Sequence, residues 1–361
     1  MLIKVQIKLE MKKVSILVST IDSGGAEKQA VLLASQLSLY TEVNLLILYG
    51  DYAEYQHNVA ILAESTVKVH KLVGCMLSKI RQVRRIIKVS ETGVLLNYLT
   101  LPDFVGSLVG RMCGIRVYNG IRNSRMPRAK ILMEKIAHNY WASGTIYNCY
   151  SGAEYFANLG FIRKKNIVIP NCFPNIEAPI IRPNHEIKTI ITVGRFDPQK
   201  DYETLIKSVS RLSRNDFRLC IVGYGVLEDA IRGWVNAFGI KDKTDIYIKP
   251  NNVPELERNA DIYISTSLFE GTSNSIMEAL NWSLPVVATN VGDNDHLVID
   301  GENGFLHPIG DVDGLSASLC QLLDSTELRN QMGQRGNWNL RVNYSMEVFE
   351  KRYIDLIEGN K

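Results

Sequence analysis

A run of small and acidic residues in the second half of the chain has the composition of a ligand-binding turn. Residues 267–292 read SLFEGTSNSIMEALNWSLPVVATNVG and follow an apolar run, residues 261–265, that is typical of a buried strand. A glycine and small polar side chains then lead into a stretch with helical spacing: Gly271, Thr272, Ser273, Asn274 and Ser275. The first backbone N–H groups of such a helix have no acceptor within the helix, so they favour a phosphate as ligand.

Two glutamates flank this turn. Glu270 stands before it, and Glu278 follows about two helical turns later. Both can line one cleft at the carboxyl end of a sheet, where ligands bind in α/β folds. A carboxylate accepts two hydroxyl protons, which suits the diols of sugars and ribose. By itself such a pair has no specificity, because Glu278 could be an exposed helix carboxylate and Glu270 a partner of the helix dipole.

The elements that must position these residues recur along the whole chain. Short β-branched runs alternate with amphipathic helical stretches in both halves, which favours parallel sheets with helices on both faces. At about 150 residues per domain, the length of 361 residues predicts two domains. Four prolines between residues 170 and 183 have linker composition. We expect a first domain at 1–171, a linker at 172–186 and a second domain at 187–361, whose terminal helix at 345–357 could pack back on the first.

Several strings together resemble glycosyltransferase family 4, the retaining nucleotide-sugar glycosyltransferases with an E-x7-E signature. The string at 267–292 carries that signature, and residues 193–205 (VGRFDPQKDYETL) look like the diphosphate-binding segment of the family. Residues 19–27 (STIDSGGAE) are similar to its first glycine-rich loop, and residues 298–306 (VIDGENGFL) match the segment after the donor site. The resemblance implies an α/β protein of the GT-B fold, with two Rossmann-like domains facing each other across a cleft. The first would bind the acceptor and the second the nucleotide sugar.

The resemblance also implies roles for single residues. Glu278 would accept hydrogen bonds from the ribose, Glu270 would contact hydroxyls of the donor sugar, and Arg195 and Lys200 would neutralise the diphosphate. A surface ion pair of either cation with Asp197 or Asp201 is the alternative. The remaining donor-binding positions are glycines and the small polar residues already named: Gly24, Gly25, Gly194, Gly223, Gly225 and Gly271 to Ser275.

One feature departs from the family pattern. Family members often present a His from the first domain to the donor sugar, whereas residues 118–125 (YNGIRNSR) contain none. Arg122 or Asn123 could replace it as a hydrogen-bond donor. Arg122 could equally contact a phosphate of the acceptor or lie at the surface.

Weaker motifs do not support metal chemistry. The D-x-D pairs at Asp293 and Asp311 do not follow a buried strand of the first domain, and Asp311 has the position of a helix cap. Gly223-x-Gly225 lacks the third glycine of a dinucleotide fingerprint. The six histidines form no H-x-x-x-H pair, so we expect no metal site and no cofactor other than the donor substrate.

Charge is distributed unevenly. Residues 1–171 hold 22 Lys and Arg against 11 Asp and Glu, while the remainder holds 19 against 27. A basic first half suggests an anionic partner, either a membrane surface or a phosphorylated acceptor, and the aromatic-interleaved stripe of a nucleic-acid binder is absent. Two basic stretches, 79–88 and 126–139, have helical spacing, and Ile131, Leu132 and Ile136 could give the second an apolar face or pack into the core.

The sequence therefore predicts a metal-independent hexosyl- or N-acetylhexosaminyltransferase that uses a UDP-sugar and a glycan or lipid-linked acceptor in surface-polysaccharide assembly. We expect the protein in the cytoplasm, because no apolar run is long enough to span a bilayer, the start is a poor secretory signal and the six cysteines are scattered. The basic first half favours a peripheral position on the inner face of the cell membrane. The alternatives are a UDP-sugar 2-epimerase and an inactive sugar-nucleotide-binding subunit. Residues 1–10 permit either a mobile extension or an added edge strand.

Overall fold

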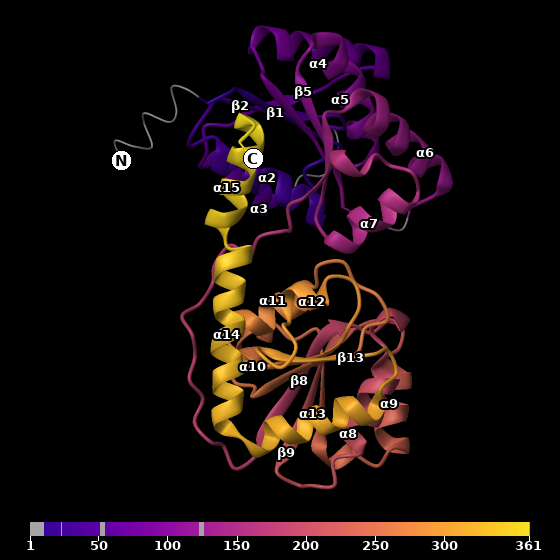
Figure 1. Ribbon diagram of the computed structural model, residues 1–361, viewed down its shortest axis with the longest axis vertical. Helices are drawn as coiled ribbons and strands as arrows, with labels where there is room; N and C mark the ends of the chain where they lie inside the picture. Colours follow the sequence, from indigo (N-terminus) through magenta and orange to yellow (C-terminus); the bar gives the residue numbers. More distant parts are fainter. Residues whose placement is uncertain (1–10, 23, 51–54, 123–125, 361) are drawn as a thin grey trace. The chain divides into compact units, whose positions relative to one another are not determined.

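The computed structural model describes residues 11–22, 24–50, 55–122 and 126–360. Contacts divide the chain into two compact units, the first comprising Met1–Asn171 and Glu347–Lys361, the second Cys172–Met346 (Figure 1). Residues 1–10 lie outside the described residues, as does Asn123. Each unit is described here by itself.

The first unit is built on a seven-stranded sheet with strand order β3-β2-β1-β4-β5-β6-β7, and every neighbouring pair is parallel. The strands are β1 (Val14–Val18), β2 (Val43–Ile47), β3 (Lys68–Lys71), β4 (Val94–Asn97), β5 (Arg116–Ile121), β6 (Gly144–Tyr147) and β7 (Asn166–Val168). The apolar runs expected near residues 13, 43, 93 and 115 form the four central strands. The edge strands β3 and β7 are short and only partly buried.

Helices connect these strands: α2 (Gly25–Leu37), α3 (Gln56–Ala63), α4 (Met76–Val89), α5 (Thr100–Cys113), α6 (Arg128–Ile136), the π-helix η1 (Ala137–Trp141) and α7 (Tyr150–Asn158). The two basic stretches expected to be helical form α4 and α6. On one face of the sheet, Val83 and Ile87 of α4 pack with Leu46 of β2 and Leu95 of β4 in a continuous core. This core holds the carboxyl ends of the central strands in one line.

The second unit has a six-stranded parallel sheet with order β10-β9-β8-β11-β12-β13. Its strands are β8 (Lys188–Arg195), β9 (Phe217–Tyr224), β10 (Thr244–Ile248), β11 (Ile262–Ser265), β12 (Val286–Thr289) and β13 (Gly304–His307). Its helices are α8 (Tyr202–Ser210), α9 (Glu228–Ala237), α10 (Val253–Arg258), α11 (Asn274–Asn281), α12 (Asn294–Leu297), α13 (Val312–Asp324) and α14 (Thr326–Tyr344). Two buried apolar clusters cover the two faces of this sheet. The expected alternation of strands and helices is confirmed in both units.

Two helix starts follow directly from the sequence. Asp201 caps α8 by accepting a hydrogen bond from the Thr204 backbone N–H, and Asp311 caps α13 by accepting from that of Gly314. A carboxylate at this position satisfies an N–H group that has no partner within the helix. The capping role predicted for Asp311 is therefore confirmed.

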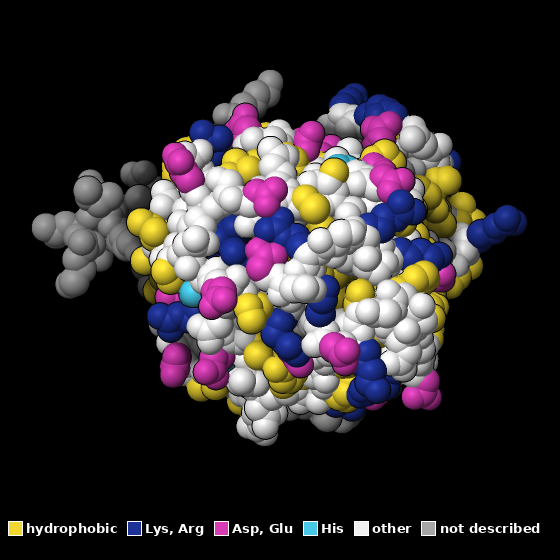
Figure 2. All heavy atoms as spheres, turned by 90° about the horizontal axis from the view of Figure 1, so that it is seen from below, with side chains coloured by type: hydrophobic (Ala, Val, Ile, Leu, Met, Phe, Trp, Pro, Cys, Tyr) yellow, Lys and Arg dark blue, Asp and Glu magenta, His cyan; other side chains and the backbone are white. Residues whose placement is uncertain are grey.

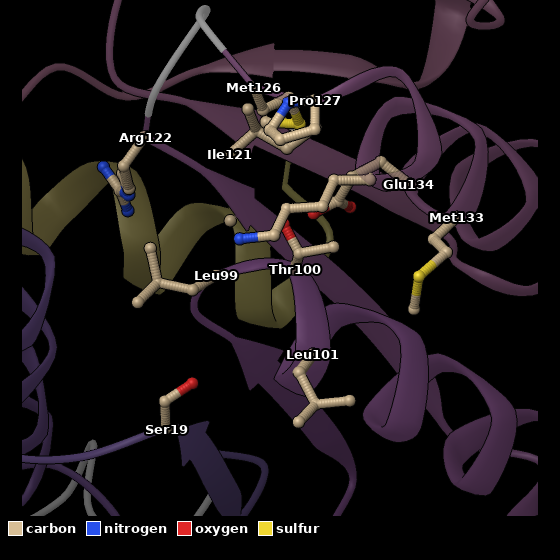
Figure 3. Close-up of a pocket in the computed structure, with 12 residues that line it drawn as sticks. Ser19, Leu99, Thr100, Leu101, Ile121, Arg122, Met126, Pro127, Met133 and Glu134 are labelled. Atoms are coloured by element: carbon tan, nitrogen blue, oxygen red, sulfur yellow. The ribbon is translucent and has the colours of Figure 1, made fainter.

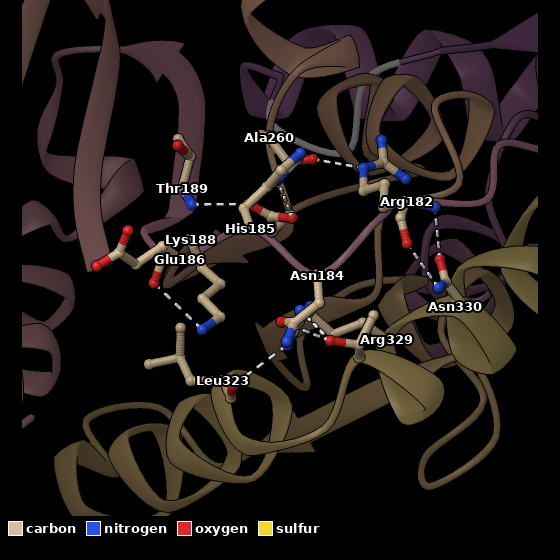
Figure 4. A network of polar contacts seen from close by, with 12 residues as sticks. Arg182, Asn184, His185, Glu186, Lys188, Thr189, Ala260, Leu323, Arg329 and Asn330 are labelled. Atoms are coloured by element: carbon tan, nitrogen blue, oxygen red, sulfur yellow. Dashed lines mark hydrogen bonds and ion pairs between the residues drawn. The ribbon is translucent and has the colours of Figure 1, made fainter. Parts of the chain in front are cut away.

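Residues 172–186, expected to be a linker, belong to the second unit and are fastened to it by Arg182. The Arg182 guanidinium is buried and donates to the backbone carbonyls of Ala260, Trp282 and Ser283. Its backbone is bonded on both sides to the side chain of Asn330 (Figure 4). Burial lowers the pKa of Arg182 to about 10, which leaves it charged at neutral pH. The proline-rich composition predicted a linker, whereas Arg182 and further hydrogen bonds at Glu177 and Ile180 hold the segment on the second unit.

The C-terminal helix α15 (Met346–Glu358) packs on the first unit, as the sequence allowed, so the expected assignment of these residues to the second domain changes. Tyr353 of α15 is fully buried, and its hydroxyl lies 3.2 Å from that of Tyr98. Glu350 accepts a hydrogen bond from Tyr40 at the end of α2. Figure 1 shows α15 beside α2 and β2.

The described helices, cysteines and surface charges bear on the expected location of the protein. None of the described helices has the length and apolar content needed to cross a bilayer. The six cysteines all lie in the described ranges, and no two of them form a disulfide. On the face shown in Figure 2, basic and acidic side chains are interspersed with one another rather than separated.

Candidate active site

Two segments meet at the carboxyl edge of the second sheet, one after β8 and the other after its neighbour β11. Lys200 and Glu270, predicted from separate motifs, form an ion pair there with 2.6 Å between Nζ and Oε1. Their side chains are only 16% and 10% exposed, so solvent screens this pair less than a surface pair. The geometry places a cation and a carboxylate at the edge where α/β folds bind ligands.

Backbone and side-chain hydrogen bonds hold the two segments together. The Leu268 N–H donates to the Gln199 carbonyl, and the Gln199 side chain donates to the Phe269 carbonyl, both at 2.8 Å. The Thr266 hydroxyl donates to the carbonyl of Lys200 at 3.0 Å. The Ser267 hydroxyl, 2.8 Å from Glu270 Oε1, is a second donor to this carboxylate that sequence reasoning missed. Its spacing, three residues before a glutamate in a turn, was the available signal.

Glu278 lies half-buried on α11, where burial raises its pKa and the charge of Lys200 opposes that rise. A further carboxyl group, which sequence reasoning also missed, stands nearby on α10. Glu257 is 2% exposed, and burial followed by repulsion from Glu278 raises its pKa to about 8. Glu257 is therefore a neutral acid at pH 7. No motif marked it, because its proximity to Glu278 arises only from the packing of α10.

Glycines allow backbone segments to approach closely beside Lys200. Gly194 and Gly223 are register partners at the ends of β8 and β9, and a Cβ on Gly223 would collide with the Gly194 carbonyl. A Cβ on Gly194 would lie 3.3 Å from the Lys200 stem. Gly225 has a φ of +151° against the backbone of Phe196, which an L side chain rarely adopts. These three predicted positions are brought together, and Gly223 and Gly225 have a packing requirement for glycine.

The small polar residues form the start of α11 as predicted. Ser273 caps the helix, its hydroxyl accepting from the Ile276 N–H, and its Oγ lies 3.2 Å from that of Ser275. Asn274 is the first helical residue, and Gly271 and Thr272 form the turn before it. The Gly271 carbonyl accepts from the Asp293 backbone N–H, which ties this turn to the segment after β12.

Arg195 takes the alternative contact that the sequence left open. Its guanidinium pairs with Asp197 at 3.2 Å, and the side chain is 67% exposed. Among the described contacts, Lys200 forms a largely buried ion pair with Glu270, whereas Arg195 forms an exposed ion pair with Asp197. The two predicted cations therefore differ in solvent exposure.

The first unit has its own cavity, of about 480 Å³, at the carboxyl ends of β1, β4 and β5 (Figure 3). Ser19, Thr100 and Arg122 line it from the ends of these strands, and Lys130 and Glu134 line it from α6. Much of the remaining lining is apolar, from leucine, isoleucine, proline and methionine side chains.

Arg122 is held inside this unit by aromatic residues. Its guanidinium lies 4.8 Å above the ring of Tyr98, and Nη2 donates to the Tyr353 hydroxyl at 2.9 Å. Nη1 lies 3.4 Å from Asn171 Oδ1, and Nε is buried with no partner among the described residues. Arg122 is not simply a surface residue: it is half-buried, joins the end of β5 to α15 and also borders the cavity.

Two buried carboxyl groups lie at this cavity: Glu134, which lines it, and Asp103 beside Glu134. Burial raises the pKa of Asp103 well above its ordinary value, and the neighbouring Glu134 raises it further. Burial likewise raises the pKa of Glu134. One oxygen of each has no hydrogen-bond partner among the described residues. Carboxyl groups this close retain a proton at neutral pH, because two adjacent buried charges repel each other. No motif in the sequence indicates this pair.

The predicted glycine-rich loop lies at the start of α2. Gly24 precedes the helix, and Gly25 is its first residue. A Cβ on Gly25 would meet no atom within 4 Å, so the space beside it is open. Among the described residues no three His, Cys, Asp or Glu side chains cluster in a way that could hold a metal ion.

Comparison with known proteins gives a consistent assignment. Residues 176–338 match the family Glycosyl transferases group 1. An N-acetylgalactosaminyltransferase of Campylobacter jejuni that acts on N-acetylgalactosamine-N,N'-diacetylbacillosaminyl-diphospho-undecaprenol is 25% identical over 355 residues, covering 88% of this chain and 92% of that protein. The lipopolysaccharide core biosynthesis glycosyltransferase LpsE of Rhizobium meliloti is 26% identical over 46% of this chain, which spans about half (49%) of the length of LpsE.

Solved structures agree on the fold. HepE from Anabaena in complex with UDP superposes with a TM-score of 0.79 over 96% of this chain and all of that one, at 17% identity. The lipopolysaccharide outer core galactosyltransferase WaaB gives a TM-score of 0.76 over 97% of this chain and all of that one, at 14% identity. The family match over residues 176–338 and the fold agree: this segment resembles the glycosyl transferases of group 1, and the chain has the GT-B fold.

Proposed function

We propose that the protein transfers a sugar from a nucleotide sugar to an acceptor hydroxyl with retention of anomeric configuration, as a member of glycosyltransferase family 4. The observation that carries the proposal is the Lys200–Glu270 pair, 2.6 Å apart, at the carboxyl edge of the second sheet. Beside it stand the Gly194–Gly223 contact and the N-terminal turn of α11, which supplies backbone amides for a phosphate.

The residues divide the work according to charge. Breaking the bond between the anomeric carbon and the diphosphate oxygen builds negative charge on that oxygen, which Lys200 and Arg195 stabilise. Glu270 accepts hydrogen bonds from the donor sugar and Glu278 from the ribose. The acceptor oxygen forms the new bond on the same face of the sugar, and its proton passes to the departing diphosphate. Lys200 thus exchanges its partner Glu270, in part, for the diphosphate when the donor binds.

The nucleotide is UDP and the transferred group a hexosyl or N-acetylhexosaminyl unit in this proposal. HepE has been solved with UDP and with UDP-glucose, which supports a UDP-sugar. The name of the Campylobacter relative supports a lipid-diphosphate-linked glycan as acceptor, and LpsE supports surface-polysaccharide assembly. We place the acceptor in the first-unit cavity, where Lys130 and Arg122 offer positive charge beside an apolar wall.

A thermal-shift screen with UDP-, GDP- and ADP-sugars tests the donor. We expect UDP-sugars to raise the midpoint of unfolding most, and a larger rise with GDP-sugars would replace the proposed nucleotide. Incubation with the UDP-sugar alone separates transfer from 2-epimerisation, since only an epimerase converts the donor without an acceptor. The relatives named above that have an assigned activity are transferases.

We also propose that cationic side chains and amides take the role of a metal. Turnover should survive EDTA, and complete loss that magnesium or manganese restores would overturn this. No further cofactor is needed, because the nucleotide sugar carries the transferred group.

Peripheral association with an anionic membrane completes the proposal and places the enzyme on the cytoplasmic face. Ile131 of α6 packs against a buried cluster with Tyr147 and Phe156, so α6 presents only part of the apolar face that the sequence allowed, with Leu132 60% exposed. Leu77 of α4 is 66% exposed on a helix rich in Lys and Arg, which favours α4 instead. Flotation with anionic and neutral liposomes at low and high salt is the test. Equal recovery on both lipids would overturn the membrane proposal.

A further inference from the structure

A second cavity of the first unit, of about 460 Å³, lies at the edge of the sheet. The edge strand β3, the beginning of β2 and the C-terminal half of α4 enclose it. It shares no lining residue with the cavity in Figure 3. Glu42 and Asn44 line it at the amino end of β2, and further lining residues follow β3 from Lys68 to Leu72.

A buried hydrogen-bond donor without a partner lines this cavity. Asn44 is 2% exposed, and its Oδ1 lies 2.8 Å from Nε2 of His70. Its Nδ2 has no partner among the described residues. An unpaired buried N–H is unfavourable, so an acceptor oxygen supplied by a ligand would stabilise this group.

The charges that line the cavity favour an anion. Among the lining residues, Lys68 pairs with the Glu42 carboxylate at 2.9 Å, and Arg85 adds a further cation. Burial lowers the pKa of His70, and repulsion from Lys68 lowers it further, so His70 adds no charge at neutral pH. Positive charge therefore remains in excess beside the Asn44 amide.

The opposite side of the cavity is apolar and continues onto the surface. Leu72, Ile86 and Val89 line it, and Val89 is 76% exposed. At the other end of α4, Val73 and Leu77 are 61% and 66% exposed. A ligand with an anionic head and an apolar stem matches both halves, because ionic and apolar contacts then form at once.

We propose that this edge cavity binds the phosphate-bearing headgroup of an anionic phospholipid, with Asn44 Nδ2 and Arg85 as donors to the phosphate oxygens. Leu72, Ile86 and Val89 then contact the adjoining glycerol and first methylene groups. The site rests on the proposed membrane association and specifies it: recognition of single lipid molecules at α4 adds to diffuse attraction of the basic surface. It is independent of the donor chemistry at Lys200 and Glu270.

Calorimetric titration of the full chain with dihexanoyl phosphatidic acid, below its micelle concentration, tests the site without a bilayer. Arg85→Ala should weaken binding at least tenfold. Arg84→Ala, which removes the same charge from the neighbouring position outside the cavity, should weaken it no more than about twofold. Equal losses of affinity in the two variants would show that diffuse charge, not the cavity, binds the lipid. Absence of binding to the unmodified protein would also overturn the proposal.

Two further titrants distinguish the source of the phosphate. Dihexanoyl phosphatidylcholine, with its zwitterionic head, and inorganic phosphate should each bind at least tenfold more weakly than phosphatidic acid. Inorganic phosphate that binds as tightly as the lipid would overturn the lipid assignment. Because Arg85→Ala leaves the second unit intact, its thermal shift with UDP-glucose should match that of the unmodified protein. If the unmodified protein binds no nucleotide sugar, the proposed function is refuted, while the result of the lipid titration still stands.

Discussion

The carboxyl edges of the two sheets handle their acidic side chains in different ways. In the second unit, Glu270 forms an ion pair with Lys200 at 2.6 Å. In the first unit, Asp103 and Glu134 stand together in a buried place where burial raises both pKa values. Glu270 therefore has a cationic partner, whereas the first pair of carboxyl groups retains a proton. Similar topology thus supports two different chemistries, and experiments that remove charge or change pH separate them.

Removal of the cation from the second edge should have the largest effect. Lys200→Ala is expected to lower kcat about 100-fold or more, because one donor to charge that develops in the transition state contributes on the order of 3 kcal/mol. Lys207→Ala is the matched control, since Lys207 lies on α8 in an exposed pair with Glu203. Steady-state kinetics with a UDP-sugar measure both. A turnover number that is unchanged in Lys200→Ala removes Lys200 from the site.

The proton retained at the first edge should make stability depend on pH. The unfolded chain releases the proton of Glu134 near its ordinary pKa of 4.5, whereas the folded chain holds it to higher pH. Stability is therefore expected to fall as pH rises above that value, until the folded group has also ionised. Glu134→Gln removes this loss and should be more stable than the unmodified protein at pH 8 by about 2 kcal/mol.

Urea unfolding of both proteins at pH 5 and pH 8 checks the prediction. Identical pH dependence in the two proteins would show that Glu134 does not retain the proton. Urea unfolding of Glu270→Gln extends the comparison to the second unit. We expect no gain in unfolding free energy at pH 8 there, because the substitution removes one partner of the Lys200–Glu270 ion pair.

A smaller effect is expected where α15 meets the first unit. Tyr353→Phe removes the hydroxyl that lies 2.9 Å from Arg122 and 3.2 Å from the Tyr98 hydroxyl. The loss of a bond to a buried charged group should cost about 1–2 kcal/mol of unfolding free energy. Tyr140→Phe, at a side chain that is 68% exposed, is the control and should change stability by less than about 0.5 kcal/mol. Equal stabilities of the two variants would contradict a structural role for the Tyr353 hydroxyl.

The smallest stability effect is expected at Arg195. Its pair with Asp197 is 67% exposed on the arginine side, and exposed pairs contribute about 0–1 kcal/mol. Arg195→Ala should therefore change the unfolding midpoint little, while the KM for the nucleotide sugar rises severalfold if the guanidinium turns to the diphosphate. An unchanged KM would contradict a role of Arg195 in binding the diphosphate and leave its pair with Asp197 as its contact.

The sequence predicted those features that depend on local pattern. The central strands are fully buried apolar runs, as in β1 and β2, and Asp201 and Asp311 lie at the helix starts that their type favours. The edge strand β3, with the sequence KVHK, is mostly exposed and lacks such a run. It was missed because a strand at the edge need not be apolar.

Contacts between distant residues were not readable. Arg122 and Tyr353 are 231 positions apart, and nothing in the string around either residue indicates the other. The Lys200–Glu270 pair spans 70 positions and became predictable only because two motifs of one family carry its members. Glu257, Asp103 and Glu134 acquire shifted pKa values from burial, which depends on tertiary packing rather than on neighbours in sequence.

The return of α15 to the first unit has a consequence for biosynthesis. Domains of a nascent chain fold largely in the order in which they emerge, yet Tyr353 reaches Tyr98 and Arg122 only after all of the second unit has been translated. Until then the guanidinium of Arg122 lacks the bond that Tyr353 supplies. A ribosome that stops before Tyr353 would release a chain whose first unit lacks these contacts, although every strand of its sheet is present. Proteases would degrade such a chain in preference to one that contains α15. The packing of α15 thus distinguishes chains that include this helix from chains that stop before it.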